Sequence, residues 1–230
     1  MKIVVLAGGL SPERNVSLST GTMVTEALRA LGHRAGLIDL YFGLETGGAD
    51  EAFFDAPVSE AYKKISREAP DLDQVRRGRK GDSPSMFGPG VLELCRMADM
   101  VFLALHGTCG EDGRVQAAFD LMGIPYTGAG YLGSAMDKDL TKRMVADVVS
   151  TPGWKTVTYT AADIDRLVET ARLPLVVKPV ASGSSIGVSI AYTAEELRRS
   201  LTEGLALGGR TVLEEYIRGR EIQVGILEDK

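Results

Sequence analysis

The sequence predicts an α/β protein in which an N-terminal domain built on a doubly wound parallel sheet is followed by a smaller α+β unit. Two continuous apolar runs, Ile3–Leu6 and Val101–Leu105, are typical of parallel strands that are buried on both faces. Segments with helical spacing of apolar residues follow such runs, and this alternation of strand and helix favours a parallel sheet. From Lys138 the pattern changes to short strands and helices around a glycine-rich turn, which indicates the second unit.

The first domain is expected over residues 1–133. Strands are predicted at 3–6, 37–40 and 101–105, and helices at 91–97 and 114–122, the last of which ends at Gly123. A further helix is predicted between the first two strands. It has Val24, Ala27, Leu28 and Leu31 on one face and ends at Gly32. Residues 41–89 are rich in glycine, proline and charge, so we interpret them as an irregular insertion with one helix near 59–67. The basic run at 76–80 is better explained as a solvated loop than as a phosphate contact.

The second unit is expected over residues 134–212. Its predicted elements are helices at 139–149 and 163–171, strands at 155–159, 175–178 and 188–191, and a helix that opens with the capping box Thr193–Glu196. Strands at 212–215 and 222–227 are expected to begin a third part, residues 213–230.

Composition excludes several classes of protein. The chain has 230 residues, 44% of them hydrophobic, and a net charge of −5, which gives no reason to expect nucleic acid or a membrane surface as a partner. Its two cysteines, Cys95 and Cys109, are too few for a disulfide framework. The apolar run at the start is too short for a secretory signal, and no segment approaches the length of a membrane span. We therefore expect a cytoplasmic protein.

A glycine-rich segment, Gly128–Gly133, fits the dinucleotide-binding pattern Gly-x-Gly-x-x-Gly. Pro125 interrupts the strand before it, and such a motif normally occupies the first turn between strand and helix, where this chain has Ala7–Glu13 instead. A junction between domains is therefore favoured over a nicotinamide or flavin site. The chain contains no Walker-type phosphate loop.

The segment Lys178–Gly187 is the most informative one. A strand ends in lysine, and two glycines bracket adjacent serines before the next strand, which makes the connection long for a simple hairpin. Exposed N–H groups, hydroxyls and a lysine suit an anion, although a surface hairpin with a solvated lysine remains an alternative. The carboxylates of Glu214, Glu215 and Glu221 suit the N–H groups of adenine and the hydroxyls of ribose, and a solvated acidic strand end explains them equally well.

The segment Leu105–Gly113 lies where a parallel strand gives way to a helix, the edge at which such sheets bind ligands. It contains His106, whereas the other histidine, His33, is interpreted as structural. No base is evident near Cys109, which argues against a catalytic thiol. A zinc site formed by His106 and Cys109 would lack further ligands.

Taken together, these segments resemble the D-alanine–D-alanine ligases of the ATP-grasp superfamily. Six pieces occur in the family's order across nearly the whole chain, apart from residues 41–89, and this is far more specific than any single match. They are Ala7–Ser19, Leu105–Gly113, Pro125–Gly128, Met136–Lys138 with Thr141–Lys142, Lys178–Gly187 and Glu214–Glu221. The resemblance implies that the second unit is an ATP-grasp subdomain, with the second ATP-grasp subdomain largely missing.

The resemblance also implies roles for residues. Lys138 and Lys178 would hold the ATP phosphates, under a loop formed by Ser182, Gly183, Ser184, Ser185 and Gly187. The adenine and ribose pocket would be lined by Glu214, Glu215, Ile217 and Glu221. Glu13 would receive the ammonium group of the first D-alanine, and Ser184 and His106 would lie near the reacting carboxylate, with Glu13 and Ser184 as the catalytic pair. A zwitterionic amino acid does need an anion for its ammonium group and donors for its carboxylate.

The activity implied is ATP-dependent joining of two D-alanines through a D-alanyl phosphate, which supplies the dipeptide for peptidoglycan synthesis. Mg²⁺ is expected for the family, with its ligands beyond Lys230, so no metal ligand is assigned within the chain. We also expect a homodimer. The alternatives are a D-alanine–D-lactate or D-alanine–D-serine ligase or, for this chain alone, a catalytically silent nucleotide-binding module. The chain is expected to be a fragment or a naturally shortened product.

Overall fold

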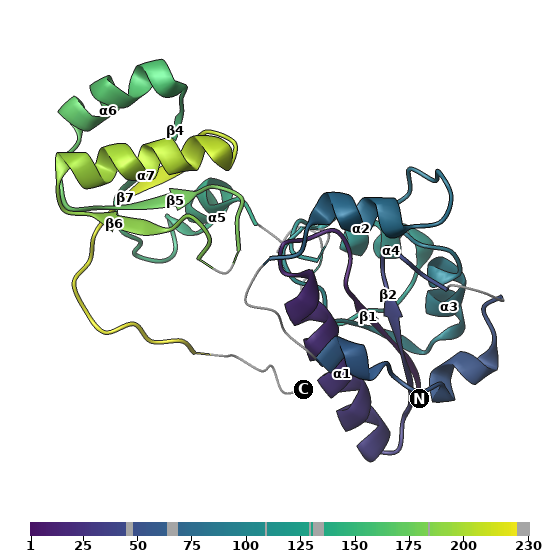
Figure 1. The fold of residues 1–230 in the computed structure, drawn as a ribbon. Coiled ribbons are helices and arrows are strands. Elements are labelled where there is room, and N and C mark those ends of the chain that lie inside the picture. The colour runs from purple at the N-terminus through teal and green to yellow at the C-terminus, as the bar shows by residue number, and fades with distance from the viewer. Residues whose placement is uncertain are drawn as a thin grey trace. The chain divides into compact units, whose positions relative to one another are not determined.

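The computed structural model describes residues 1–44, 48–63, 69–108, 110–128, 130, 136–183 and 185–224. The chain divides into two compact units, each with its own sheet and core (Figure 1). The first unit comprises Met1–Asp137 with Ser182–Ser184, and the second comprises Lys138–Ala181 with Ser185–Lys230. No helix within the described ranges is long and apolar enough to cross a membrane.

The first unit contains the predicted parallel sheet. Its strands β1 (Lys2–Ala7), β2 (Arg34–Asp39) and β3 (Met100–Leu103) pair in the order β2-β1-β3, and both pairings are parallel. Alternate residues of β1 enter two different cores. Val4 and Leu6 pack with residues of α3 (Val91–Met97) and α4 (Arg114–Met122), whereas Ile3, Val5 and Ala7 pack with α1 (Arg14–Ala30). The central strand is therefore buried on both faces, as its unbroken apolar run predicted.

The buried face of α1 agrees with the predicted one only in part, since Val24 and Leu28 pack against the core but the other two predicted residues do not. Ala27 is exposed, and Leu31, just past the helix end, is 74% exposed. The buried positions include Leu18, Gly21 and Thr22 instead. The helix lies so close to the sheet that a Cβ on Gly21 would come within 2.8 Å of the Cβ of Ala7. Small residues allow this approach, and the apolar spacing alone gave no sign of it.

Residues 41–89 are more ordered than predicted. They contain the short helices η1 (Glu51–Asp55), η2 (Glu60–Lys63) and α2 (Leu72–Gly78). The predicted helix at 59–67 is only η2 in its described part, since residues 64–68 lie outside the described ranges, and α2 was not predicted. Phe54 is completely buried in the core that contains Val4 and Leu6. The segment is therefore an integral part of the first unit.

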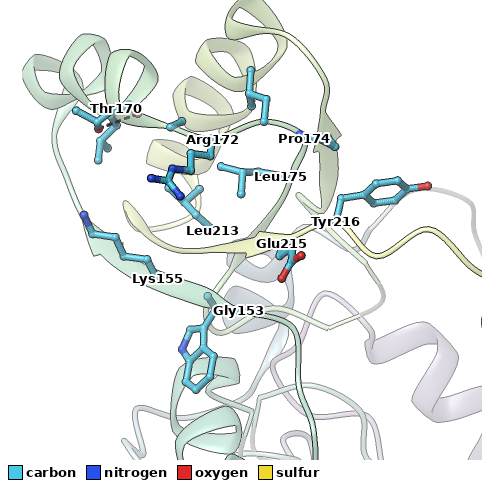
Figure 2. Close-up of a pocket in the computed structure, with 13 residues that line it drawn as sticks. Gly153, Lys155, Thr170, Arg172, Pro174, Leu175, Leu213, Glu215 and Tyr216 are labelled. Atoms are coloured by element: carbon cyan, nitrogen blue, oxygen red, sulfur yellow. Dashed lines mark hydrogen bonds between the residues drawn. The ribbon is translucent and has the colours of Figure 1, made fainter.

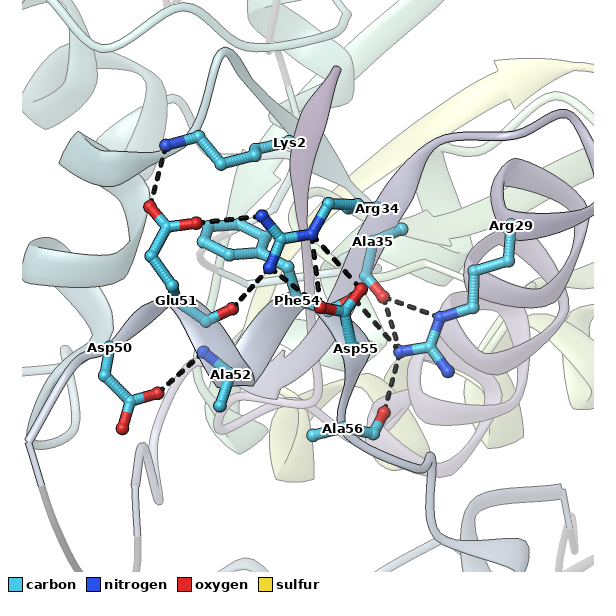
Figure 3. Close-up of polar contacts among 10 residues, drawn as sticks. All are labelled: Lys2, Arg29, Arg34, Ala35, Asp50, Glu51, Ala52, Phe54, Asp55 and Ala56. Atoms are coloured by element: carbon cyan, nitrogen blue, oxygen red, sulfur yellow. Dashed lines mark hydrogen bonds and ion pairs between the residues drawn. The ribbon is translucent and has the colours of Figure 1, made fainter.

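Polar contacts hold η1 against β2 and α1 (Figure 3). Arg34 on β2 donates hydrogen bonds to the carboxylates of Asp55 and Glu51 at 2.7 and 2.9 Å, and Lys2 reaches Glu51 at 2.9 Å. Arg29 on α1 donates to the carbonyl oxygens of Ala35 and Ala56 at 2.6 and 2.7 Å. These exposed pairs contribute little energy individually, but together they fix the path of the chain over the sheet edge.

The basic run at 76–80 is used partly within the first unit. Arg76 pairs with Asp73 at 2.5 Å. The guanidinium of Arg79 lies 4.6 Å from the ring centroid of Tyr41 and donates to the carbonyl oxygen of Phe87 at 2.9 Å. Arg77 is largely exposed. Residues 76–78 are therefore the end of α2 and not part of a loop as predicted, and Arg79 is partly buried.

The second unit is an α+β structure around an antiparallel sheet. Its strands β4 (Trp154–Thr158), β5 (Leu175–Pro179), β6 (Ser189–Ala191) and β7 (Arg210–Glu215) pair in the order β4-β7-β5-β6. Helices α6 (Ile164–Thr170, after the short helix η3 at Ala161–Asp163) and α7 (Ala194–Ala206) cover one face and share a core with that face (Figure 1). The capping box of Thr193 and Glu196 at the start of α7 is present as predicted.

The end of one predicted helix, one predicted domain division and one predicted strand in this unit differ from the structure. Helix α5 spans Lys138–Val145 and ends before residue 149. The expected division between 212 and 213 falls inside β7, which is an internal strand of the sheet. Residues 222–224 of the strand expected at 222–227 form no strand and are exposed, and residues 225–227 lie outside the described ranges. Apolar residues at 222 and 224 therefore do not reach a core in the described part of the chain.

Candidate functional site

A buried ion cluster lies on the second unit's sheet, on the face that α5 covers. Glu214 on β7 receives Lys178 of the neighbouring strand β5, whose Nζ is 2.6 Å from Oε1. Lys142 of α5 reaches the other carboxylate oxygen, with its Nζ 2.9 Å from Oε2. The side chain of Glu214 is only 10% exposed. One buried carboxylate thus neutralises one of two ammonium groups, and the cluster carries a net positive charge.

The charge state of Glu214 follows from this arrangement. Burial favours the neutral acid and raises the pKa of the carboxyl group, but the hydrogen bonds and charges of Lys178 and Lys142 outweigh burial and hold the pKa below its ordinary value. Glu214 is therefore ionised at neutral pH. An anionic ligand that reached this cluster would meet two lysines that share a single counter-ion.

A second residue of α5, Asp139, binds Trp154 of β4 and so helps to hold the helix beside the cluster. Asp139 accepts a hydrogen bond from Nε1 of Trp154 at 3.0 Å and pairs with Arg143 at 3.1 Å. The indole hydrogen bond is the main cause, and the nearby Arg143 a further one, of a pKa of about 2 for Asp139. The ammonium group of Lys142 lies 4.9 Å from the centroid of the Trp154 ring. Lys142, Asp139 and Trp154 were not singled out from the sequence, although Lys142 belongs to one of the matched segments.

The other predicted phosphate lysine begins α5. The backbone N–H of Lys138 donates to the carbonyl oxygen of Val180 at 3.0 Å, which ties the helix start to the segment after β5. The serine-rich loop that follows has a defined shape at its far end. Ser185 has φ of +56°, and Gly187 has φ of +72° with no room for a Cβ, which would come within 2.4 Å of Leu207. Both residues are exposed.

The remaining loop residues are placed less completely. Ser182 and Gly183 are half-buried and group with the first unit. Ser184, the residue predicted to act in catalysis, lies outside the described residues, as does Cys109. The described part of the loop is therefore a connection between β5 and β6 that is half-buried at 182–183, exposed and sharply turned at 185–187, and longer than a hairpin requires.

The four residues predicted to line the adenine pocket do not gather in one place. Successive residues of a strand point to opposite faces, so Glu215 points away from the face that carries Glu214. Ile217 and Glu221 follow the strand and are exposed. Only Glu214 joins the lysine cluster in the described structure.

A cavity lies on the opposite face of β7 (Figure 2). It has a volume of about 580 Å³. Its lining includes Leu213 and Glu215, which share one face of β7, and Lys155, which pairs with Leu213 across β4 and β7. Arg172, from the segment before β5, also lines it.

The cavity opens on the face that α6 and α7 cover, because Leu213 belongs to the core under these helices. Glu214 lies on the other face of β7. Trp154, which lies against Lys142, also lines the cavity.

In the first unit, Glu13 lies at the carboxyl ends of β1 and β3. Its backbone N–H donates to the hydroxyl of Ser11 at 3.1 Å, and α1 begins at the next residue. A Cβ on Gly107 would come within 2.7 Å of Glu13 Oε2 and 2.5 Å of Ser11 Oγ. His106 Nε2 lies 3.3 Å from the hydroxyl of Thr20 on α1. The structure therefore brings Glu13 and the loop at His106 together, two parts of the chain that the family resemblance assigns to the same substrate.

The loop before Glu13 is held by buried residues that the sequence did not identify as supports. The Ser17 hydroxyl accepts from the N–H of Gly8 at 2.8 Å and donates to the carbonyl oxygen of Ala104 at 2.7 Å, which links the ends of β1 and β3. Arg14 donates to Gly9 at 2.9 Å and forms a buried ion pair with Asp39 at the end of β2. The sequence offered a partial signal, because Arg14 belongs to the matched segment Ala7–Ser19 but its partner Asp39 does not.

The alternatives that the sequence disfavoured concern a reactive thiol, a metal site and a dinucleotide site. The thiol was that of Cys109, which lies outside the described residues. The other cysteine, Cys95, is buried, and burial raises the pKa of its thiol to about 12. No group of three His, Cys, Asp or Glu residues in the described part of the chain forms a metal-binding cluster. The strand before Gly128 pairs with β3 through a single bridge between Val101 and Tyr126, unlike the central strand of a dinucleotide-binding fold.

Comparison with known proteins identifies the family. The model of the D-ala D-ala ligase N-terminus matches residues 2–129, and that of the D-ala D-ala ligase C-terminus matches residues 147–230. This chain belongs to the D-alanine–D-alanine ligase family. The D-alanine–D-alanine ligase of Lacticaseibacillus casei is 40% identical over 232 residues, which are 99% of this chain and 64% of the relative. That of Aquifex aeolicus is 36% identical, with 63% of its length covered.

Solved structures of the family have the same fold. The D-alanine–D-alanine ligase of Bacillus anthracis matches 95% of this chain and 58% of its own length, with 29% identity and a TM-score of 0.61. A structure of the same protein complexed with ATP matches with a TM-score of 0.60. The ligase of Coxiella burnetii matches with 28% identity and a TM-score of 0.63. The predicted ATP-grasp architecture is confirmed, and the chain spans less than two-thirds of the length of these relatives.

Proposed function

We propose that this chain is the larger part of an enzyme that joins two D-alanines at the expense of ATP. Family membership supports the activity, because the matched curated relatives are named D-alanine–D-alanine ligases. The observation that carries the proposal is the cluster in which Glu214 is shared by Lys142 and Lys178. Its net positive charge and its exchangeable ion pair suit the polyphosphate of a nucleotide.

In this proposal the second unit binds ATP. Lys178 and Lys138 contact the phosphates, and the loop of Ser182–Gly187 covers them with its N–H groups and hydroxyls. Glu214 accepts from the adenine amino group, while Glu215, Ile217 and Glu221 approach the base and the ribose once the chain after β7 folds over the nucleotide. The last assignment requires a change of path after Glu215, since those residues are exposed in the described structure.

The first unit binds the amino acid that is activated. Glu13 receives the ammonium group of the first D-alanine, and His106 and Ser184 contact its carboxylate. That carboxylate attacks the γ-phosphorus of ATP and expels ADP, which gives D-alanyl phosphate. The amine of the second D-alanine attacks the carbonyl carbon, loses a proton and expels inorganic phosphate. Positioning and neutralisation of charge contribute most of the rate acceleration in such reactions.

Magnesium, the homodimer, the cytoplasmic location and the role in peptidoglycan synthesis all belong to this proposal. The described residues supply no cluster for a metal, so none of them is assigned to magnesium and no step is derived through it. The relatives' names do not favour a D-alanine–D-lactate or D-alanine–D-serine ligase. A silent nucleotide-binding module remains the second candidate for the 230 residues alone, since they span 64% of the Lacticaseibacillus relative.

The test compares two proteins. One is the 230-residue chain, and the other, called the joined protein, is this chain followed by the part of the Lacticaseibacillus ligase that lies beyond the match. We expect the joined protein to release phosphate from ATP only with D-alanine and to form the dipeptide, detected by mass spectrometry. D-lactate and D-serine are offered as competing second substrates. A folded joined protein without D-alanine-dependent phosphate release would contradict the proposal, and turnover by the 230-residue chain would exclude the silent module.

A further inference from the structure

The two lysines of the cluster are held very differently. The ammonium group of Lys142 has three donors, and the structure uses all of them, on Glu214, the Thr151 hydroxyl and the carbonyl oxygen of Pro152 at 3.2 Å. The Trp154 ring also lies against it. Lys142 is therefore a saturated cation, and its side chain is only 12% exposed.

Lys178 has donors to spare. Within the described ranges its ion-pair partner is Glu214, and its side chain is 27% exposed, more than twice the value for Lys142. Its strand leads into the serine-rich loop. If one of the two lysines turns toward an incoming phosphate, Lys178 can do so with the loss of a single contact, whereas Lys142 would lose three.

The departure of Lys178 has a consequence for Glu214. A buried carboxylate that lost its only cation would be strongly destabilised. Lys142 binds the other oxygen, so Glu214 keeps one ion pair when Lys178 leaves. The freed Oε1 then becomes an acceptor for a donor on the nucleotide base.

We propose that Lys142 is a positioning residue for nucleotide binding, which keeps Glu214 paired and oriented while Lys178 exchanges that carboxylate for phosphate. This inference rests on the proposed function, because it takes Lys178 as a phosphate ligand. It differs from a direct role, since Lys142 acts only through Glu214. Without Lys142, Glu214 would have Lys178 as its remaining cation in the cluster, so Lys178 would stay paired with this carboxylate. Phosphate binding would then weaken even though Lys142 does not contact the phosphate.

The chain contains its own reporter for this exchange. Trp154 is the single tryptophan, and its ring lies against Lys142. Its fluorescence is followed while the 230-residue chain is titrated with ATP and, separately, with inorganic tripolyphosphate. The variants are Lys142→Met, Glu214→Gln and the two combined. Lys142→Arg is the matched control that keeps the charge, and thermal unfolding of each variant shows that it is folded.

For tripolyphosphate, we expect Lys142→Met to weaken binding by about tenfold, the size usual for groups that interact directly in a network. Glu214→Gln is expected to bind at least as tightly as the unchanged chain, because it releases Lys178 in advance. In the Glu214→Gln background, Lys142→Met is expected to have no further effect. Lys142→Arg is expected to remain within about twofold of the unchanged chain, since it retains the ion pair.

Two results would overturn the inference. Equal weakening by Lys142→Met with and without Glu214 would mean that Lys142 contacts the phosphate itself. Unchanged binding in a folded Lys142→Met variant would mean that Glu214 needs no second partner. Either result leaves ATP binding, and with it the proposed function, intact. Absence of ATP binding in both the unchanged chain and the joined protein would instead overturn the proposed function.

Discussion

Lys178 on β5 and Glu214 on β7 form an ion pair of 2.6 Å on the α5 face of the second unit's sheet. Their strands are neighbours, but the two residues are 36 positions apart in the sequence. In the proposed site, Lys178 exchanges this carboxylate for phosphate, so Glu214 is the counter-ion of Lys178 until the nucleotide binds. The cluster is thus prepared in advance for negative charge, which reduces the cost of ordering it on binding.

Lys178→Ala is expected to weaken ATP binding by about ten- to a hundredfold, because a charge-assisted hydrogen bond contributes roughly 1.5–3 kcal/mol. Ser184→Ala should cost much less, since a hydroxyl carries no charge. Lys155→Ala is the control, because Lys155 lies on the same sheet and lines the cavity on the opposite face. Calorimetry measures all three variants. An affinity unaffected by Lys178→Ala would refute the assignment of the loop.

Glu13→Gln in the joined protein is expected to raise the KM for D-alanine by about ten- to a hundredfold and to leave ATP affinity nearly unchanged, since the ammonium group loses its counter-ion. Steady-state kinetics with each substrate varied in turn measures the effect. Glu26→Gln on the same helix, at an exposed position, serves as the control. Equal damage to ATP binding, or only a loss of stability, would point to a structural role for Glu13.

Gly107→Ala tests the close approach of Glu13 to the loop at His106. Gly107 has φ of +68°, and an added Cβ would collide with Ser11 and Glu13. Gly123→Ala is a matched control, because Gly123 has φ of +65° but open space around its Cα. Backbone strain of about 1–2 kcal/mol is common to both variants. Urea unfolding should show a further loss of about 1–3 kcal/mol for Gly107→Ala alone, and a similar loss in both variants would contradict the geometry.

The stability of the second unit is expected to depend on pH through Asp139. Its pKa in the folded state is about 2, against 3.8 for an ordinary aspartate. The folded state therefore favours the ionised form. The stabilisation is complete above pH 3.8 and is lost as the pH falls toward 2.

Urea unfolding between pH 5 and pH 2, monitored by Trp154 fluorescence, measures this dependence. Asp139→Asn is expected to be less stable at pH 5 and to show a flatter pH profile in the same window. Asp147→Asn, at an exposed position just beyond α5, is the control and should retain the profile of the unchanged chain. A profile that Asp139→Asn did not flatten would assign the acid sensitivity to other carboxylates.

The hydrophobic patterns predicted those strands and helices whose structure depends mainly on their own residues. The apolar runs predicted β1 and β3, and the bounds of α3 and α4 agree with the predicted helices. The face of α1 was only partly predicted, because Gly21 and Thr22 pack by virtue of their small size. The burial of Phe54 was missed, because it packs with residues distant in the sequence, such as Val4 and Val101. Packing of this kind leaves no signal in a single segment.

The candidate site could likewise be predicted only in part from the sequence. The family resemblance assigned Glu13 and His106 to one substrate, and the structure places Glu13 beside the loop that contains His106. The relation of Glu214 to Lys142 depends on the register of β7 against β5 and on the position of α5, and neither can be deduced from spacing. The adjacent acids Glu214 and Glu215 looked equivalent in the sequence. The alternation of the strand places them on opposite faces.

This alternation has a pharmacological consequence. Glu215 lines the 580 Å³ cavity on one face of the strand, and the adjacent Glu214 binds the lysines on the other face. A compound that filled the cavity would contact Glu215, which is proposed to approach the base and the ribose of ATP, and would lie beside the segment that holds Glu214. It would not enter the space around Lys178 that is proposed for the phosphates. Inhibitors designed for this face would therefore compete with the base end of ATP and not with its phosphates.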